Sequence, residues 1–420
     1  MPVVVLLGTL DTKGPELRYL RDRITAAGCS VTLVDTGVRS TDSEADISAD
    51  EVAAAAGEER AVLARAGDRG AAVMAMARGA AAIVGRLHAA GRLDGIGGVG
   101  GSGGSSIAAA AMQALPVGVP KLLVSTMASG DTRPYVGTSD IALLYPVVDI
   151  AGLNQLSERI LANAAGALAG MTRAAIAFEP AGPARTVIGA TAYGVTTPCV
   201  DAARAWLEAR GFEVLTFHAT GSGGQAMELL VRASFIGGVL DVTLSEITDE
   251  VVGGAFTAGP HRLEAAADMG IPQVVSLGAA EMATFGPPET VPPAYRARRL
   301  VRHNDSITLM RISGEESVRL GQAVAAKLNR ASGPVTLFIP RAGLSSLSVP
   351  GAVFHDPDAD AALFESLRSA LDARIEIVEM DTHINDPTFA RAMAERLSAL
   401  CERETASGGR PVDTVRPNDG

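Results

Sequence analysis

The chain contains one strand–turn–helix–strand pattern twice, once near its start and once near its middle. The first copy has an apolar segment at 3–7, a helical segment at 15–27 and a second apolar segment at 30–35. Two strands joined through a helix are expected to be parallel, with a right-handed crossover. The second copy follows the same order, at 185–194, 198–210 and 213–217. The repeat predicts an α/β protein of two Rossmann-like, doubly wound parallel-sheet domains.

Later segments of the two copies also correspond, and they set the expected domain limits. Residues 96–99 match 236–239, and residues 117–125 match 269–277. A length of 420 residues is also what two such domains require. We therefore expect an N-terminal domain at 1–180 with an insertion at about 39–79, a C-terminal domain at 181–402, and a disordered tail at 403–420.

A run of glycine and serine at 97–106 is the strongest functional signal. It follows a short strand approach at 93–96 and precedes an alanine-rich helical segment. Glycines let backbone N–H groups converge, and a helix N-terminus adds unpaired donors and partial positive charge, so the run predicts a phosphate site. It has neither the lysine of a Walker A loop nor the spacing of the dinucleotide fingerprint. The alternative is a flexible surface loop.

Polar residues follow four predicted strands of the first domain. Ligands of parallel sheets bind beyond the carboxyl ends of the strands, so these loops are expected to share one crevice. Lys13 would neutralise phosphate, Asp35 would accept from a ribose hydroxyl, and Asp131 or Asp149 would hold Mg²⁺. The alternative is that Asp11 and Asp131 only cap helices or turns. The predicted binding residues are Gly8, Thr9, Asp11, Thr12, Lys13, Asp35, Gly101, Ser102, Gly103, Gly104, Ser105, Thr126, Ser129, Gly130 and Asp131.

The corresponding loops of the second domain carry histidines and carboxylates but no second glycine run. Asp241 and Glu246 would repel a phosphate there, so we expect one nucleotide per chain. A small carboxylate or other polar metabolite suits the second domain better. A zinc site is the weaker alternative. The catalytic residues stay unknown, and the candidates are His261, His303, Asp381, His383 and Asp386.

Composition excludes some partners. The net charge is −11 with no basic run, which argues against nucleic-acid binding. No apolar run reaches the ~18 residues of a membrane span. The cysteines Cys29, Cys199 and Cys401 form no CxxC pair and predict free thiols of a cytoplasmic protein. The insertion and the alanine-rich helices offer extra apolar surface, which predicts a homodimer.

Several of these segments together resemble a known family. They are 8–13, 97–106, 127–131, 303–304 and 383–386, and the resemblance extends over about residues 1–402. The family is that of the plant tobamovirus-resistance-protein-like ATP-binding domain, found in bacteria, fungi and plants. It implies two Rossmann-like subdomains, ATP binding through the first, homodimerisation, and a TIM-barrel protein as partner. The chain departs from the family at 281–286 and at Ser348, both in the second domain.

Residues and resemblance together give two functional hypotheses. The first is an ATP-dependent enzyme, or enzyme subunit, of small-molecule metabolism that uses ATP with Mg²⁺ and works with a TIM-barrel partner. The alternative is a non-catalytic ATP-binding module that regulates or scaffolds a partner protein. A nicotinamide dehydrogenase is disfavoured because the G-x-G-x-x-G spacing is absent.

Overall fold

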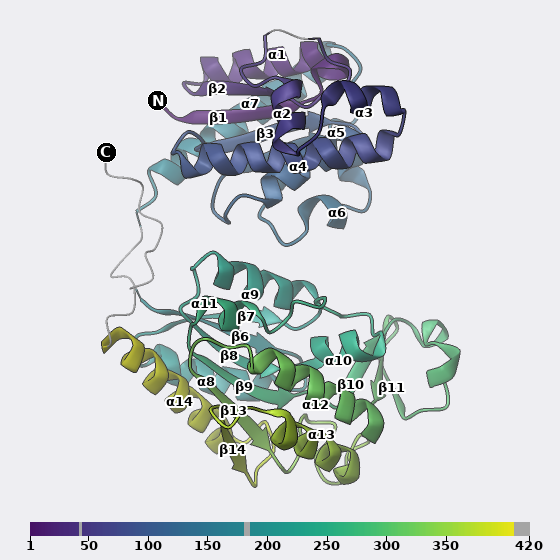
Figure 1. Ribbon diagram of the computed structural model, residues 1–420, viewed down its shortest axis with the longest axis vertical. Coiled ribbons are helices and arrows are strands. Elements are labelled where there is room, and N and C mark those ends of the chain that lie inside the picture. The colour runs from purple at the N-terminus through teal and green to yellow at the C-terminus, as the bar shows by residue number, and fades with distance from the viewer. Residues whose placement is uncertain (42–43, 180–184, 407–420) are drawn as a thin grey trace. The chain divides into compact units, whose positions relative to one another are not determined.

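The computed structural model describes residues 1–41, 44–179 and 185–406, and the chain divides into two compact units between residues 181 and 182 (Figure 1). Each unit is built on a parallel sheet with helices on both faces. The predicted fold class is confirmed. Of the predicted tail, residues 403–406 belong to the last helix, and 407–420 lie outside the described residues.

The sheet of the first unit has the strand order β2-β1-β3-β4-β5, and all neighbouring pairs are parallel. Alternate residues of β1 point to opposite faces. Val4 and Leu6 pack with helices α1 and α7, whereas Val5 and Leu7 pack with α4 and α5. The strands are β1 (Val3–Gly8), β2 (Ser30–Asp35), β3 (Gly95–Gly100), β4 (Lys121–Ser125) and β5 (Ala142–Leu144). The helices are α1 (Leu10–Ala26), α2 (Ala49–Ala55), α3 (Arg60–Ala66), α4 (Arg69–Ala89), α5 (Ser102–Gln113), α6 (Arg133–Val136) and α7 (Gln155–Ile176).

The first half of the glycine run is strand, not loop. Strand β3 extends to Gly100, and all of its residues are buried. A Cβ on Gly98 would lie 2.7 Å from the Cβ of Ala108, and one on Gly100 would lie 2.7 Å from the backbone of Ser105. These glycines therefore let α5 lie close against the sheet. The expectation that 97–100 form part of a turn was wrong, because close packing against a helix overrides the low strand propensity of glycine.

The predicted insertion at about 39–79 contains helices α2 and α3 and the first part of α4. Helix α2 crosses α4 closely, since a Cβ on Gly79 would lie 1.9 Å from the carbonyl oxygen of Val52. Helix α4 runs beyond the predicted end of the insertion at Gly79 to Ala89. Within the described residues it is the one helix long and apolar enough to cross a membrane. Its buried residues, Met76 and Ile83 among them, pack in the core of the first unit.

The sheet of the second unit has the order β14-β13-β9-β8-β6-β7. When the strands of each sheet are numbered from one along the chain, the first sheet has the order 2-1-3-4-5 and the second has 2-1-3-4-5-6. The shared order confirms the internal repeat. Helices α8 and α14 cover one face, and α9 to α13 pack on the other. The strands are β6 (Val187–Ala192), β7 (Glu213–His218), β8 (Gly238–Thr243), β9 (Gln273–Gly278), β13 (Val335–Pro340) and β14 (Glu376–Met380). The helices are α8 (Thr197–Glu208), α9 (Ser222–Arg232), α10 (Ser245–Val252), α11 (Ala265–Met269), α12 (Gly314–Leu328), α13 (Pro357–Ala370) and α14 (Pro387–Ala406).

The second unit also carries a small antiparallel sheet that the sequence analysis did not anticipate. Its order is β10-β12-β11, with β10 at Met282–Phe285, β11 at Leu300–Asn304 and β12 at Ile307–Arg311. Ala283 and Met310 join the same core cluster as α10 and α12. Residues 281–286, where the sequence is expected to depart from the family that it resembles, contain β10 of this sheet.

Candidate anion-binding site

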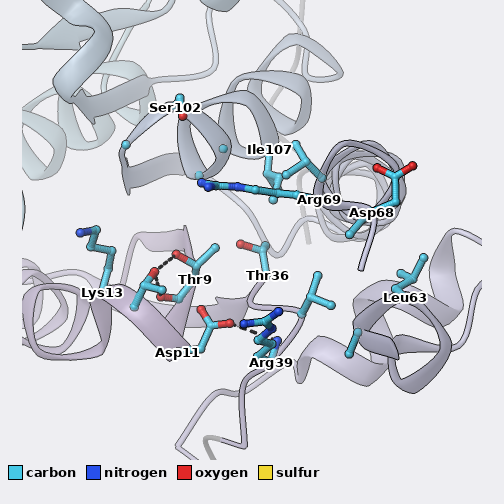
Figure 2. A pocket seen from close by; sticks show the side chains of 18 of the residues that line it. Thr9, Asp11, Lys13, Thr36, Arg39, Leu63, Asp68, Arg69, Ser102 and Ile107 are labelled. Carbon is cyan, nitrogen blue, oxygen red and sulfur yellow. Dashed lines mark hydrogen bonds between the residues drawn. The ribbon is translucent and has the colours of Figure 1, made fainter. Parts of the chain in front are cut away.

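A cavity of about 630 Å³ opens at the carboxyl ends of β1, β2 and β3 (Figure 2). Its size is that of a small-molecule site. Strands β1 and β3 are neighbours in the sheet, but their connections run to opposite faces, and this switch point is where doubly wound sheets bind ligands. Three of the four predicted loops line the cavity, and the insertion supplies the remaining wall.

The N-terminus of α5 forms one wall of the cavity. Its first residues are the second half of the glycine run, with Gly101 as the N-cap and no side chain capping the helix. The N–H of Ser105 bonds to the carbonyl of Gly101 at 2.8 Å. The preceding N–H groups, of Ser102, Gly103 and Gly104, have no hydrogen-bond partner among the described residues. Unpaired donors at the positive end of a helix dipole are the feature with which helix N-termini bind anions, so this terminus is a candidate anion-binding site.

Three basic side chains line the same cavity: Lys13, Arg39 and Arg69. The ammonium of Lys13 donates to the carbonyl of Ile150. In the part of the chain that is described, the guanidinium groups of Arg39 and Arg69 make no hydrogen bond or ion pair. Arg69 points toward the start of α5, and its Nη2 lies 3.8 Å from where a Cβ on Gly103 would be (Figure 2). A cation beside a helix N-terminus is unfavourable unless an anion lies with it.

The acidic residues of the cavity are already engaged with the backbone. Asp11 Oδ2 accepts from the N–H of Arg39 at 3.0 Å, and Asp68 Oδ1 accepts from the N–H of Ala71 at 3.0 Å as the N-cap of α4. Sequence reasoning left open a capping role for Asp11, and its carboxylate does brace the β2 loop. A carboxylate oxygen that accepts a backbone N–H neutralises less of the positive charge of Lys13, Arg39 and Arg69. The electrostatics of the cavity therefore favour an anionic ligand.

The remaining wall is apolar. It is formed by Val38 after β2, Leu63 on α3, Val73 on α4 and Ile107 on α5. An apolar wall next to a cationic helix terminus suits a ligand with one flat or apolar end and one anionic end.

Asp35 and Ser105 do not line the cavity. Asp35 is 1% exposed, and its Oδ1 accepts from the N–H groups of Leu10 at 3.1 Å and Gly37 at 2.8 Å. Burial raises the pKa of this carboxyl. Asp35 thus holds the β1 and β2 loops in register. Ser105 is buried and its hydroxyl is 2.6 Å from that of Ser125, which ties α5 to β4. Gly8 is buried at the end of β1, where a Cβ would meet Leu17 at 2.4 Å.

The fourth predicted loop lies outside the cavity lining. Thr126 and Ser129 bound a single turn of 3-10 helix, and Gly130 follows it. Thr126 Oγ1 lies 3.8 Å from where a Cβ on Gly101 would be. Asp131 is exposed and pairs with Arg133, whose hydrogen bonds lower the pKa of that carboxyl to about 2.

The other suggested Mg²⁺ ligand, Asp149, is exposed and accepts from the N–H of Ile150 at 2.8 Å. Across the described residues, no group of three or more His, Cys, Asp or Glu could hold a metal ion.

Sequence reasoning missed Arg39, Leu63 and Arg69 as lining residues. All three belong to the predicted insertion at about 39–79, in which no binding residue was predicted. A signal was present, because Gly67 followed by Asp68 is a helix C-terminus followed by an N-cap, and it marks Arg69 as the first residue of a new helix.

The five candidate residues of the second unit lie on three separate segments. His261 is exposed, and its Nδ1 lies 3.0 Å from Glu264 Oε2 in the turn before α11. His303 is exposed on β11. Asp381, His383 and Asp386 share the loop after β14, where Asp381 pairs with Arg341 and Asp386 accepts from the N–H of Thr388 at 2.8 Å. The Nδ1 of His383 is buried without a partner among the described residues.

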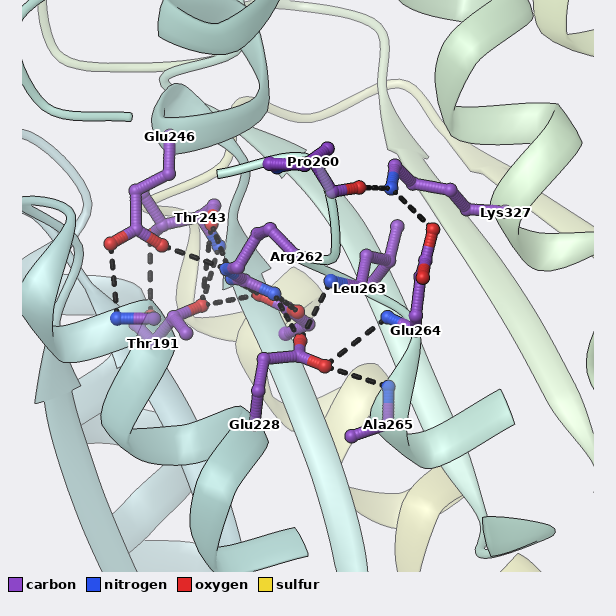
Figure 3. Close-up of polar contacts among 12 residues, drawn as sticks. Thr191, Glu228, Thr243, Glu246, Pro260, Arg262, Leu263, Glu264, Ala265 and Lys327 are labelled. Carbon is purple, nitrogen blue, oxygen red and sulfur yellow. Dashed lines mark hydrogen bonds and ion pairs between the residues drawn. The ribbon is translucent and has the colours of Figure 1, made fainter. Parts of the chain in front are cut away.

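At the switch point of the second unit, the protein's own side chains take the place of an anion (Figure 3). Glu246 is fully buried, and its Oε1 accepts from the N–H groups of Gly221 at 2.7 Å and Gly224 at 3.0 Å, at the start of α9. Its Oε2 lies 2.7 Å from Arg262 Nε. Arg262 is 1% exposed and also binds Asp241 through two bonds of 2.6 and 2.7 Å. A carboxylate and a buried guanidinium therefore fill this end of the sheet.

Comparison with known proteins gives the family. The N-terminal domain of the uncharacterised protein family UPF0261 matches residues 2–177, and its C-terminal domain matches 185–401. The chain belongs to this family. It is 49% identical to a UPF0261 protein of Clostridium tetani over 402 residues, which cover 95% of this chain and 99% of the relative.

A plant relative bears out the resemblance found in the sequence. The ToMV resistance protein Tm-1 of Solanum lycopersicum is 38% identical over an alignment of 439 residues, which covers all of this chain and 58% of the tomato protein. Among solved structures, a Methanocaldococcus jannaschii UDP-GlcNAc 2-epimerase covers 66% of this chain and 83% of its own, with a TM-score of 0.24 and 9% identity. A similarity this low supports no argument about the UPF0261 site.

Proposed function

We propose that the first domain binds ATP in the cavity and that the protein is an ATP-dependent enzyme, or enzyme subunit, of small-molecule metabolism. The observation that carries the proposal is the set of unpaired N–H groups of Ser102, Gly103 and Gly104, with Arg69 beside them. Phosphates at this helix terminus receive charge-assisted hydrogen bonds, with Arg39 and Lys13 within the same cavity.

The rest of the ligand has matching surroundings. The base packs on the apolar wall of Val38, Leu63, Val73 and Ile107, and the ribose lies by Thr36 and Asp11. Mg²⁺ keeps several waters and binds mainly through the phosphates, so it needs only one or two carboxylates. Asp11 lines the cavity and Asp131 does not, so Asp11 is the better placed of the two.

The partners follow from the same expectation. We propose that the protein is a cytoplasmic homodimer and that a TIM-barrel protein supplies the remainder of the enzyme. A small polar or carboxylate substrate is proposed for the second domain. These assignments rest on the family resemblance and on the sequence, and the light-scattering mass of the purified protein tests the first of them directly.

One observation favours the alternative, a non-catalytic ATP-binding module. The carboxylates of the cavity, Asp11 and Asp68, both accept backbone N–H groups, and its described lining contains no histidine, cysteine or glutamate. Such a lining binds an anion without an evident general base. Release of phosphate or pyrophosphate, assayed with the TIM-barrel partner present, separates the two functions.

Isothermal titration with ATP, ADP, NAD and inorganic phosphate tests the binding site. We expect one ATP per chain and loss of binding in the double variant Gly103→Val, Gly104→Val. A Cβ at either position would meet no atom closer than 3.5 Å, so the fold tolerates the change while the valine methyl groups block the approach of a phosphate to the backbone.

The matched control is Gly166→Val with Gly170→Val on α7, where a Cβ meets nothing within 4 Å. Far-UV circular dichroism of both variants checks that they fold. Unchanged ATP affinity in the Gly103 and Gly104 variant contradicts the proposal, and so does failure of the wild-type protein to bind ATP.

A further inference from the structure

Helix α3 is loosely anchored beside the cavity, with Leu63 partly buried against the core of the first unit. None of its residues is buried, and no side chain caps its N-terminus. Gly57 precedes it and Gly67 ends it, with φ of +78° and +71°, and a Cβ on either would meet nothing within 4 Å. Because glycine adopts positive φ without steric cost, the backbone can rotate at Gly57 and Gly67, and the segment between these two glycines can move as a unit.

One side chain fastens α3 to the wall of the cavity. Arg60 Nη1 donates to the carbonyl oxygens of Val38 at 3.2 Å and Ser40 at 2.9 Å, and its Nε donates to Asp50 Oδ1 at 2.8 Å. Val38 lines the cavity, whereas Arg60 does not. Arg60 therefore joins α3 to the β2 loop from outside the ligand space.

On the inner side, α3 contributes Leu63 and Ala64 to the cavity lining. We propose that α3 is a lid over the nucleotide and that Arg60 is the residue that positions it in the closed state. This rests on the proposed function, because the closed lid is stabilised by contact of Leu63 with a bound ligand. The start of α4 stays in place, since Asp68 caps that helix and Gly67 absorbs the movement.

The lid has a kinetic consequence that a purely structural helix lacks. Removal of the Arg60 bonds raises the population of the open state. The apparent Kd equals the intrinsic Kd divided by the fraction of closed molecules, so apparent affinity weakens, and the ligand is released faster. Asp50 and the two carbonyl oxygens lose their partner in Arg60→Ala. Lysine can restore the pairing with Asp50 but not all three bonds at once, so Arg60→Lys recovers part of the effect.

Limited trypsin digestion reports the lid directly, because α3 contains Arg60 and Arg65. At saturating ATP, confirmed by titration of the same sample, we expect cleavage after Arg65 to slow by about tenfold or more, as the open population falls. Arg60→Ala should show faster cleavage, about tenfold weaker affinity and faster release, as expected for the loss of charged hydrogen bonds. The control Arg65→Ala, on the exposed side of the same helix, should leave affinity unchanged.

The outcomes separate the two proposals. If wild-type protein binds no ATP, the proposed function is wrong and the lid falls with it. If ATP binds and cleavage after Arg65 does not slow, the lid is overturned and the nucleotide site stands. Equal affinity and equal release rate in Arg60→Ala and wild type, with normal circular dichroism, also overturn the role of Arg60.

Discussion

The two sheets share one strand order, yet their switch points are used in opposite ways. In the first unit the helix after the third strand is α5, which begins Ser102-Gly103. Its first three N–H groups are unpaired among the described residues, and Ser102, Gly103 and Gly104 line the cavity. In the second unit the corresponding helix begins Ser245-Glu246, and the Glu246 carboxylate occupies the glycine turn at the start of α9. The two glycine-rich helix starts follow different strands, α5 the third strand of its unit and α9 the second, and they differ in one respect: a buried carboxylate of the protein caps α9, whereas no side chain caps α5.

Glu246→Ala should have the largest effect on this comparison. The change leaves Arg262 short of a buried partner and the N–H groups of Gly221 and Gly224 unpaired, and breaking a buried pair costs about 3–5 kcal/mol. Trp206 is the one tryptophan of the chain and lies on α8, so urea unfolding followed by its fluorescence reports the second unit.

Two controls sharpen this result. Glu250→Gln, at an exposed position on the same helix, should change the unfolding free energy by no more than about 0.5 kcal/mol. Added phosphate should stabilise Glu246→Ala more than wild type, because an anion can enter the vacated turn. A loss below about 1 kcal/mol in Glu246→Ala would break the comparison, since such a loss is that of an exposed ion pair.

The second test concerns a buried carboxyl of the second unit, Glu281, which precedes β10. Glu281 is fully buried, and burial raises its pKa to about 7 although Ser345 donates to it. Between about pH 4.5 and pH 7, the Glu281 carboxyl therefore keeps its proton in the folded state but has lost it in the unfolded state. The stability from the protonated carboxyl is complete below about pH 4.5 and is lost as the pH rises through 7, a change of about 3 kcal/mol.

Glu281→Gln removes this titration. Relative to wild type, the variant should gain about 3 kcal/mol in unfolding free energy between pH 4.5 and pH 8 by the same linkage. Urea unfolding at both pH values, again followed by Trp206 fluorescence, measures it. A difference between variant and wild type that is the same at both pH values would show that folding does not shift the pKa of Glu281.

The smallest effect is expected from Arg69→Ala in the first unit. Loss of a charged hydrogen bond of about 1.5–3 kcal/mol predicts ATP affinity about 10–100-fold weaker by titration. The nucleotide-free variant should instead be more stable by about 0.3–1 kcal/mol, because a cation leaves the positive end of α5. Arg86→Ala, exposed on the same helix, is the control. Arg69→Ala with wild-type affinity would mean that the first site holds its anion without Arg69.

Local sequence was a good guide to the repeated part of the fold. Apolar runs predicted β1 and β2 and their counterparts in the second unit. For β1 and β6 the reason is burial on both faces, which leaves a continuous apolar run. Local sequence was a poor guide to Gly97 and Gly98. Their isolated sequence is that of a flexible turn, and only the approach of α7 and α5 makes the absence of a side chain a packing requirement.

The candidate site divides in the same way. The sequence by itself determined that a glycine-rich helix N-terminus would follow a parallel strand, because both the helix start and the strand are local properties of the chain. The tertiary structure alone decided which side chains face that terminus. It buried Asp35 and Ser105 as supports, brought Arg69 to the start of α5 from the insertion, and placed Arg262 against Glu246 in the second unit. Contacts between segments distant in sequence depend on how elements pack, and no local pattern specifies that packing.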